Sequence, residues 1–163
     1  MTTERCRDGV VKEEKNIANR TKNKPRDDPN QPLKDLMALV VAQELYDETL
    51  RIICKEDLFP KKSRWLFAEK IANTANDFTG MISYANSIEA DTPKLALERH
   101  EAQRLAWALL AKLNTLMENA QRHYRFNPNR IGHWCHIFNR ERGLLSRWIN
   151  NDDITNNVRS LLI

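Results

Sequence analysis

The sequence predicts an all-α protein with an up-down-up-down antiparallel four-helix bundle, and three observations favour this class. The 163 residues include only 4 glycines and 6 prolines, fewer than an all-β sandwich or barrel needs for its turns. Pro60, Pro93 and Pro128 bound proline-free stretches of roughly 27 to 35 residues, and proline breaks helix interiors. Within these stretches apolar residues recur at spacings of three and four, as on one face of a helix. Four long helices with short connections are therefore expected.

The chain divides into three zones of different composition: a polar N-terminal arm over 1–31, the helical bundle over 32–150 and a short C-terminal tail over 151–163. The arm contains 8 Lys/Arg and 6 Asp/Glu but few apolar side chains. Such a segment buries too little apolar surface to offset the entropy of ordering it. Two interpretations stay open: a flexible tail, or an arm that orders against a partner or nucleic acid.

The first two helices are expected over 33–57 and 63–89. In the first, the core-facing positions are expected to be Leu36, Leu39, Tyr46, Leu50 and Ile53. In the second, they are expected to be Ala68, Ile71, Ala75, Phe78, Ile82 and Ala85. Ser63 is expected to cap this second helix. Gly80 lies inside it, where glycine costs about 1 kcal/mol relative to alanine. We therefore expect Gly80 to permit a close helix crossing.

The third and fourth helices have clear start signals. Thr92 before Pro93 is a capping residue followed by proline at the first helical position, and Asn127-Pro128 repeats the pattern. The third apolar stripe is expected to be Ala102, Leu105, Leu109, Leu113, Leu116 and Ala120. The fourth is expected to be Ile131, Trp134, Cys135, Phe138, Leu145, Trp148 and Ile149.

Apolar residues also flank these stripes. They are Val40, Val41, Trp65, Leu66, Trp107 and Leu110. One reading is that they are ordinary surface apolar residues. The other is that they form an interface, which predicts a homo-oligomer.

The sequence contains no recognisable catalytic, metal or cofactor site. Both common glycine-rich phosphate-binding motifs, GxGxxG and GxxxxGK[ST], are absent. His133 and His136 share a helix face, but neither a HExxH glutamate nor a CxxC pair completes a metal site. A non-enzymatic protein with no catalytic residue, no metal and no cofactor is therefore expected.

The cysteines and the hydropathy predict a cytoplasmic protein. Cys6, Cys54 and Cys135 are an odd number and widely spaced, which does not suggest a disulfide framework. No apolar run approaches the roughly 18 residues of a membrane-spanning helix, so no membrane association is expected.

Positive charge is concentrated near the end of the chain. Residues 121–149 contain 6 basic residues and 1 acidic residue, although the whole chain carries only +4. The six are Arg122, Arg125, Arg130, Arg140, Arg142 and Arg147. In an up-down bundle, Lys61, Lys62 and Arg64 of the first loop lie at the same end as the third loop. Arginine binds phosphate through its forked guanidinium, so these nine residues are the predicted nucleic-acid or partner-binding site. The alternative is a solvated face whose arginines pair with acidic residues of the first helix.

Two short motifs resemble a known family. Residues 59–65 read FPKKSRW and lead into Ile71, and residues 144–149 read LLSRWI. They resemble the entry to the second helix and the close of the fourth helix in the accessory variability determinant (Avd) proteins of diversity-generating retroelements. Relatives encoded in ribosomal RNA intervening sequences share the pattern. The resemblance covers about residues 36–150.

The resemblance implies a barrel-shaped homopentamer of four-helix protomers that binds nucleic acid and the element's reverse transcriptase. In that family, the complex makes mutagenised complementary DNA from a template RNA, and the accessory protein has no catalytic site. The implied function is that of a retroelement accessory protein. The alternative is a four-helix scaffold of a mobile element or ribosomal RNA insertion with a different partner.

Overall fold

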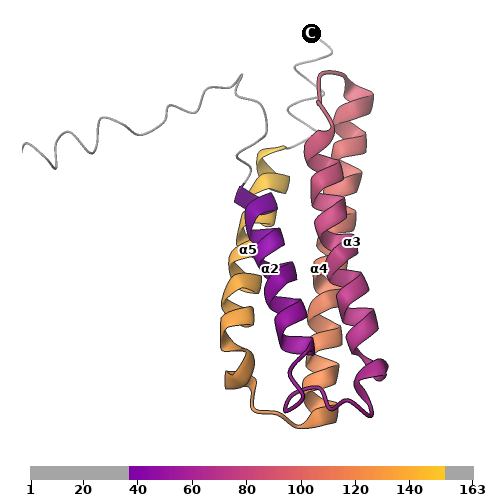
Figure 1. Cartoon of the computed structure of the whole chain (residues 1–163). Helices are drawn as coiled ribbons and strands as arrows, with labels where there is room; N and C mark the ends of the chain where they lie inside the picture. Colours follow the sequence, from indigo (N-terminus) through magenta and orange to yellow (C-terminus); the bar gives the residue numbers. More distant parts are fainter. Residues whose placement is uncertain (1–36, 153–163) are drawn as a thin grey trace, which may run out of the picture. The chain divides into compact units, whose positions relative to one another are not determined.

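A computed structural model describes residues 37–152 of the chain, and every regular element within them is a helix. The four α-helices in Figure 1 are α2 (Met37–Ile53), α3 (Ala68–Ser87), α4 (Pro93–Tyr124) and α5 (Gly132–Asn151). Two short 3-10 helices, η1 (Arg64–Leu66) and η2 (Pro128–Ile131), precede α3 and α5. The predicted all-α class is confirmed for this part of the chain. The N-terminal arm over 1–31 and the tail beyond residue 152 lie outside the described residues.

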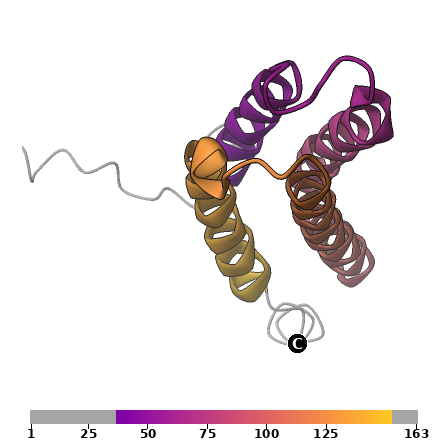
Figure 2. The ribbon, with the colours of Figure 1, turned by 90° about the horizontal axis from the view of Figure 1, so that it is seen from below.

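Each α-helix packs against two others. Helix α2 contacts α3 and α5, and α4 also contacts α3 and α5. Helices α4 and α5 pack less closely on each other than the other three neighbouring pairs do, and they stand apart in Figure 2. The α2–α3 and α4–α5 connections lie at the same end of the unit (Figure 1). This placement brings the two basic loops of the sequence near each other.

Helix α3 has the predicted core face. All six expected residues are buried: Ala68, Ile71, Ala75, Phe78, Ile82 and Ala85. Helix α4 begins as expected, because Thr92 Oγ1 accepts the Leu95 backbone N–H at 3.2 Å and Pro93 is the first helical residue. These features depend on residues close in sequence, which is why the sequence pattern predicts them.

The predicted core face of α2 is wrong in part. Val41, Leu45 and Ile52 are buried at its centre, whereas Leu39, Tyr46 and Leu50 lie partly buried at the margin of the core. The expected Ile53 is buried, and Leu36 lies outside the described residues. Because α3 and α5 both pack on α2, the face between these two neighbours is covered, and the predicted stripe was rotated to one side of it.

The predicted stripe of α4 also needs correction. Leu105 is 55% exposed, and Ala106 and Leu110 occupy the core in its place. In α5 and the preceding η2, the expected Ile131, Trp134, Phe138 and Leu145 are buried. The other three, Cys135, Trp148 and Ile149, are partly buried against the core. Because apolar residues cover a broad surface of α4, more than one of its faces could be buried. Contact with α3 and α5 decides which face is buried.

Two local predictions are wrong. Ser63 precedes η1 rather than α3, and its side chain makes no capping hydrogen bond. Gly80 does not mark a close helix crossing, because a Cβ atom built there would meet nothing within 4 Å. The chain first makes a short 3-10 turn after Ser63, so α3 begins only at Ala68.

The flanking apolar residues divide into two groups. Val41 and Leu110 belong to the core, whereas Val40, Trp65 and Trp107 are exposed, with Trp65 at 71%; Leu66 lies between these groups as a partly buried residue. No helix of the described part is long and apolar enough to cross a membrane. The exposed apolar residues leave the predicted homo-oligomer as a prediction.

Candidate nucleic-acid interface

The α2–α3 loop is fastened to the end of α4 by aromatic contacts. The Tyr124 hydroxyl donates a hydrogen bond to the Ser63 backbone carbonyl at 2.6 Å. The Tyr124 ring lies edge-on to Phe59 and Phe67, with centroid distances of 5.3 and 5.7 Å. His123 also contacts Phe67, at 5.4 Å. Lys62 and Arg125, which adjoin Ser63 and Tyr124 in sequence, are therefore brought to one place from separate loops.

Arg64 has a structural role in this loop. Its Nε and Nη2 atoms donate to the Phe59 carbonyl at 3.2 and 3.1 Å, and Nη2 also donates to the Cys54 carbonyl at 3.2 Å. Three hydrogen bonds from one guanidinium hold the segment between the end of α2 and η1. Most of its donors thus point at the protein's own backbone, so Arg64 is poorly placed to contact phosphate.

Two other cations of this end have carboxylate partners. Lys61 Nζ lies 2.8 Å from Glu56, and Arg130 forms an ion pair with Asp57 across the two loops. The hydrogen bond from Arg130 is the main cause that holds the pKa of Asp57 below its ordinary value. All four side chains are more than half exposed, where ion pairs add little to stability. Their positive charge is nevertheless locally balanced.

Three cations at this end have no such partner. Lys62, Arg122 and Arg125 are exposed and form no ion pair with any carboxylate within residues 37–152. Arg122 donates to the neutral Asn119 Oδ1 at 2.6 Å, and Arg125 takes a left-handed backbone conformation with φ of 54° as it ends α4. We call these three residues the basic end. Its charge has no carboxylate partner among these residues, which leaves the three cations free to neutralise phosphates.

The arginines of α5 lie away from the basic end. Arg140 and Arg147 lie about 12 and 22 Å along α5 from its first residue, at a rise of about 1.5 Å per residue. Arg140 lies 3.6 Å from Glu44 of α2, which is the cross-helix pairing that the alternative interpretation expected. Arg147 donates to the Gly143 carbonyl at 3.3 Å. Arg142 is exposed and lines a hollow between α4 and α5.

A groove between α4 and α5 was not foreseen in the sequence. Residues of both helices line three adjoining hollows, and Trp107 borders all of them. Arg104 of α4 and Arg142 of α5 also line the groove. The sequence singled out Trp107 as an apolar residue outside the main stripe. Only the loose packing of α4 on α5 makes it the centre of a concave surface.

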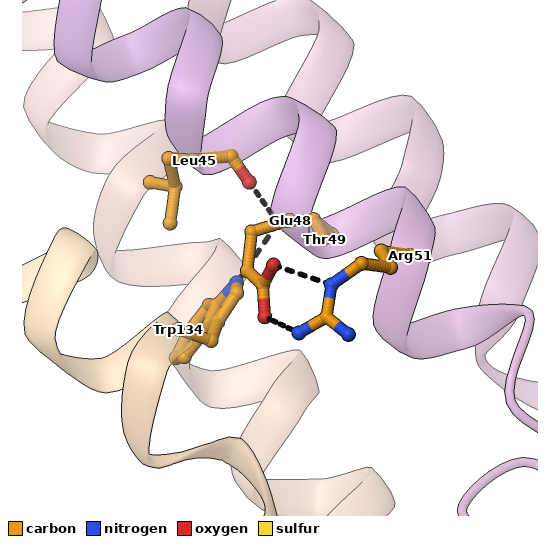
Figure 3. A network of polar contacts seen from close by, with 5 residues as sticks. All are labelled: Leu45, Glu48, Thr49, Arg51 and Trp134. Atoms are coloured by element: carbon orange, nitrogen blue, oxygen red, sulfur yellow. Dashed lines mark hydrogen bonds and ion pairs between the residues drawn. The ribbon is translucent and has the colours of Figure 1, made fainter.

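The opposite side of α5 faces carboxylates of α2. A hollow there is lined by Glu44, Asp47 and Glu48. Arg51 Nε donates to Glu48 Oε2 at 2.7 Å, and this hydrogen bond is the main cause of a lowered pKa at Glu48 (Figure 3). The acidic side chains make the α2–α5 side a poor surface for phosphate, so basic and acidic surfaces are segregated around α5.

A buried polar contact fixes α5 against α2. Trp134 Nε1 donates to Thr49 Oγ1 at 2.8 Å, and Thr49 Oγ1 donates to the Leu45 carbonyl at 2.6 Å (Figure 3). Both side chains are buried, so the indole N–H would otherwise have no partner. The contact sets how α5 lies on α2, and with it which residues of α5 face α4.

Metal ligation finds no support within the described part of the chain. There, no three His, Cys, Asp or Glu side chains lie close enough to hold a metal ion. His133 and His136 are both exposed on α5. The only two acid oxygens that are buried without a hydrogen-bond partner there belong to one residue, Glu141. A single carboxyl cannot form a metal centre.

No protein-family model matches this chain, and no curated protein or solved structure is similar enough to it to count as a match. Its function must therefore be argued from its own residues.

Proposed function

We propose that this protein is a non-catalytic accessory protein that binds nucleic acid. The observation that carries the proposal is the basic end, where Lys62, Arg122 and Arg125 are exposed and form no ion pair with a carboxylate of residues 37–152. Exposed cations beside the aromatic rings of His123 and Tyr124 suit a phosphate backbone and its bases. Of the other predicted residues at this end, Lys61, Arg64 and Arg130 are less suited to binding because they already have partners within the protein.

The wider proposal is that of a retroelement accessory protein in the cytoplasm. In this proposal, the four helices form an up-down-up-down antiparallel bundle. Several copies assemble into a homo-oligomer, and the resemblance to Avd proteins implies a pentamer. Its protein partner is a reverse transcriptase, and the complex supports template-RNA-directed cDNA synthesis and mutagenic diversification. The motifs at residues 59–65 and 144–149 support this part of the proposal.

A second candidate function is that of a four-helix scaffold of a mobile element or ribosomal RNA insertion with another protein partner. Trp65 is 71% exposed beside the α2–α3 loop, and Val40 is 46% exposed on α2. Large exposed apolar side chains are typical of protein interfaces when they gather into a patch. Pull-down with a co-expressed reverse transcriptase from the same genomic neighbourhood separates the two candidates.

The nucleic-acid proposal is tested by salt-dependent binding. Fluorescence anisotropy with a labelled single-stranded oligonucleotide gives the slope of log affinity against log salt. Each lost phosphate contact reduces the magnitude of that slope by about 0.7. We expect the triple variant Lys62→Glu, Arg122→Glu, Arg125→Glu to bind more weakly across sequences and to flatten the slope by about 2.

The matched control is the double variant Lys61→Gln, Arg130→Gln, which removes two cations of the same end that already have carboxylate partners. We expect it to change affinity much less. A folded triple variant that binds as tightly as the parent at every salt concentration would exclude the basic end as the binding surface. Circular dichroism of each variant checks that the helices remain.

A further inference from the structure

The α4–α5 groove is large enough to hold part of a ligand. Its three adjoining hollows have volumes of about 500, 250 and 390 Å³. Trp107 borders each of them and is 38% exposed, although Leu110, one turn further along α4, is buried in the core. Ala108 and Ala111 line the groove beside Trp107, so the residues next to the indole on α4 are small. A large aromatic ring is thus accessible in a concave site.

The charge of the groove is positive. Arg104 lies on the α4 side and Arg142 on the α5 side, and neither forms an ion pair with a carboxylate of residues 37–152. None of the residues that line the three hollows is an aspartate or glutamate. The hollow on the α2–α5 side has the opposite character, with three carboxylates. An anionic ligand is therefore favoured between α4 and α5.

The remaining polar groups of the groove suit bases. Asn139, Ser146 and Asn150 of α5 line it and carry hydrogen-bond donors and acceptors. An exposed indole between two arginines, with amide and hydroxyl groups opposite, is the combination that single-stranded nucleic-acid sites use. An acidic peptide would also match the charge, but aspartate and glutamate side chains have no aromatic face to stack on the exposed indole.

We propose that the α4–α5 groove binds single-stranded nucleic acid, with a base stacked on Trp107 and the flanking phosphates at Arg104 and Arg142. This inference rests on the proposed nucleic-acid function and adds a second contact surface to the basic end. A duplex is excluded from this mode, because its bases are already stacked on one another and paired at their edges. RNA and DNA single strands share the chemistry, and the experiment distinguishes them.

The test uses the full chain and labelled oligo(rU) and oligo(dT) of about 12 nucleotides, within the usual site size of single-strand binders. We expect tryptophan fluorescence to fall on binding and Trp107→Ala to remove most of that fall. Affinity should drop between about fivefold and a hundredfold, the range for loss of one stacked base. Trp107→Phe keeps an aromatic ring and should restore part of the affinity.

Leu105→Ala is the matched control, because Leu105 is a large apolar side chain of α4 that is 55% exposed and lines none of the three hollows. We expect it to leave affinity and quenching unchanged. The double variant Arg104→Gln, Arg142→Gln should flatten the salt slope by about 1.4. A higher affinity for oligo(rU) than for oligo(dT) would show a preference for RNA, and the reverse would show a preference for DNA.

The outcomes separate the two proposals. If the parent binds neither oligonucleotide, both the proposed function and this inference are wrong. If the parent binds and Trp107→Ala binds equally well, the inference alone is overturned, and the groove is left for a protein partner. If a Trp107→Ala variant that melts like the parent loses affinity for a duplex as strongly as for single strands, stacking is also overturned.

Discussion

At the scale of single residues, Glu141 has the most unusual environment. It lies on α5 with no exposed surface, and neither carboxyl oxygen has a hydrogen-bond partner among the described residues. Burial raises the pKa of Glu141 to about 8, and the neighbouring Arg140 opposes this only in part. The carboxyl is therefore protonated in the folded protein at neutral pH, whereas in the unfolded chain it is ionised.

The raised pKa predicts a loss of stability with rising pH. In the unfolded chain, the pKa of a glutamate carboxyl is about 4.3. The contribution of Glu141 to the free energy of unfolding is therefore complete below about pH 4.3. It is lost as the pH rises through about 8, the pKa of Glu141 in the folded protein. We expect the free energy of unfolding to fall by up to about 1.4 kcal/mol per pH unit within this window. Glu141→Gln should remove that dependence, whereas Glu101→Gln, on an exposed position of α4, should keep it. Urea unfolding at several pH values measures both, and identical profiles for the parent and Glu141→Gln would contradict the assignment.

The buried Thr49–Trp134 contact yields a second prediction at this scale. Thr49→Val keeps the shape of the side chain but leaves the Trp134 indole N–H without its acceptor. An unsatisfied buried donor costs about 1–3 kcal/mol. We expect chemical denaturation to show a loss of this size for Thr49→Val and a smaller loss for Thr49→Ser, which retains the hydroxyl. A Thr49→Val protein as stable as the parent would show that the indole finds another partner.

At the scale of elements, the connections decide where the functional side chains lie. Arg64 holds the α2–α3 loop through the carbonyls of Cys54 and Phe59, and Tyr124 holds the same loop to the end of α4. The helices supply the scaffold, but the hydrogen bond between Tyr124 and Ser63 joins the loop that carries Lys62 to the end of α4 that carries Arg125. A change at Arg64 should therefore act on binding through the loop.

We predict that Arg64→Lys destabilises the protein although it keeps the charge. The lysine ammonium cannot reproduce the planar fork that reaches two carbonyls, and hydrogen bonds from charged groups contribute about 1.5–3 kcal/mol. Thermal melting should show a lower transition temperature. The affinity for nucleic acid should also fall, and this loss should be smaller at lower temperature. If Arg64→Lys melts like the parent yet binds oligonucleotide poorly, Arg64 is a direct contact residue instead.

At the scale of the whole molecule, exposed apolar side chains predict self-association. Val40, Trp65 and Leu105 are all more than a third exposed, on α2, η1 and α4. Apolar groups spread over several elements are compatible with an assembly that covers more than one face of the protomer. Light scattering at micromolar concentration should give a mass above the 19.1 kDa of one chain. A stable monomer would contradict the prediction. If the Trp65→Arg variant forms an assembly of the same mass as the parent, Trp65 is not part of the interface.

The sequence by itself determined the helical class, the face of α3 and the start of α4. These features depend on residues within a few positions of one another, such as Thr92 and Leu95. Helical periodicity brings residues three and four apart onto one face, whatever the rest of the chain does. For α2, whose apolar surface is broad, periodicity predicted a face rotated to one side of the buried one. The covered face there became clear only from its packing between α3 and α5.

Only the tertiary structure decided which cations are paired and where a groove opens. The charge count of residues 121–149 was correct, but it could not show that Arg130 pairs with Asp57, 73 positions away, or Arg140 with Glu44. An ion pair depends on a distance of a few ångströms, and composition carries no distances. In the same way, Trp107 became a candidate base-stacking residue only because α4 and α5 pack loosely and leave hollows beside it. The physical reason is that surface charge and concavity arise from segments far apart in the chain, whereas the sequence pattern records only near neighbours.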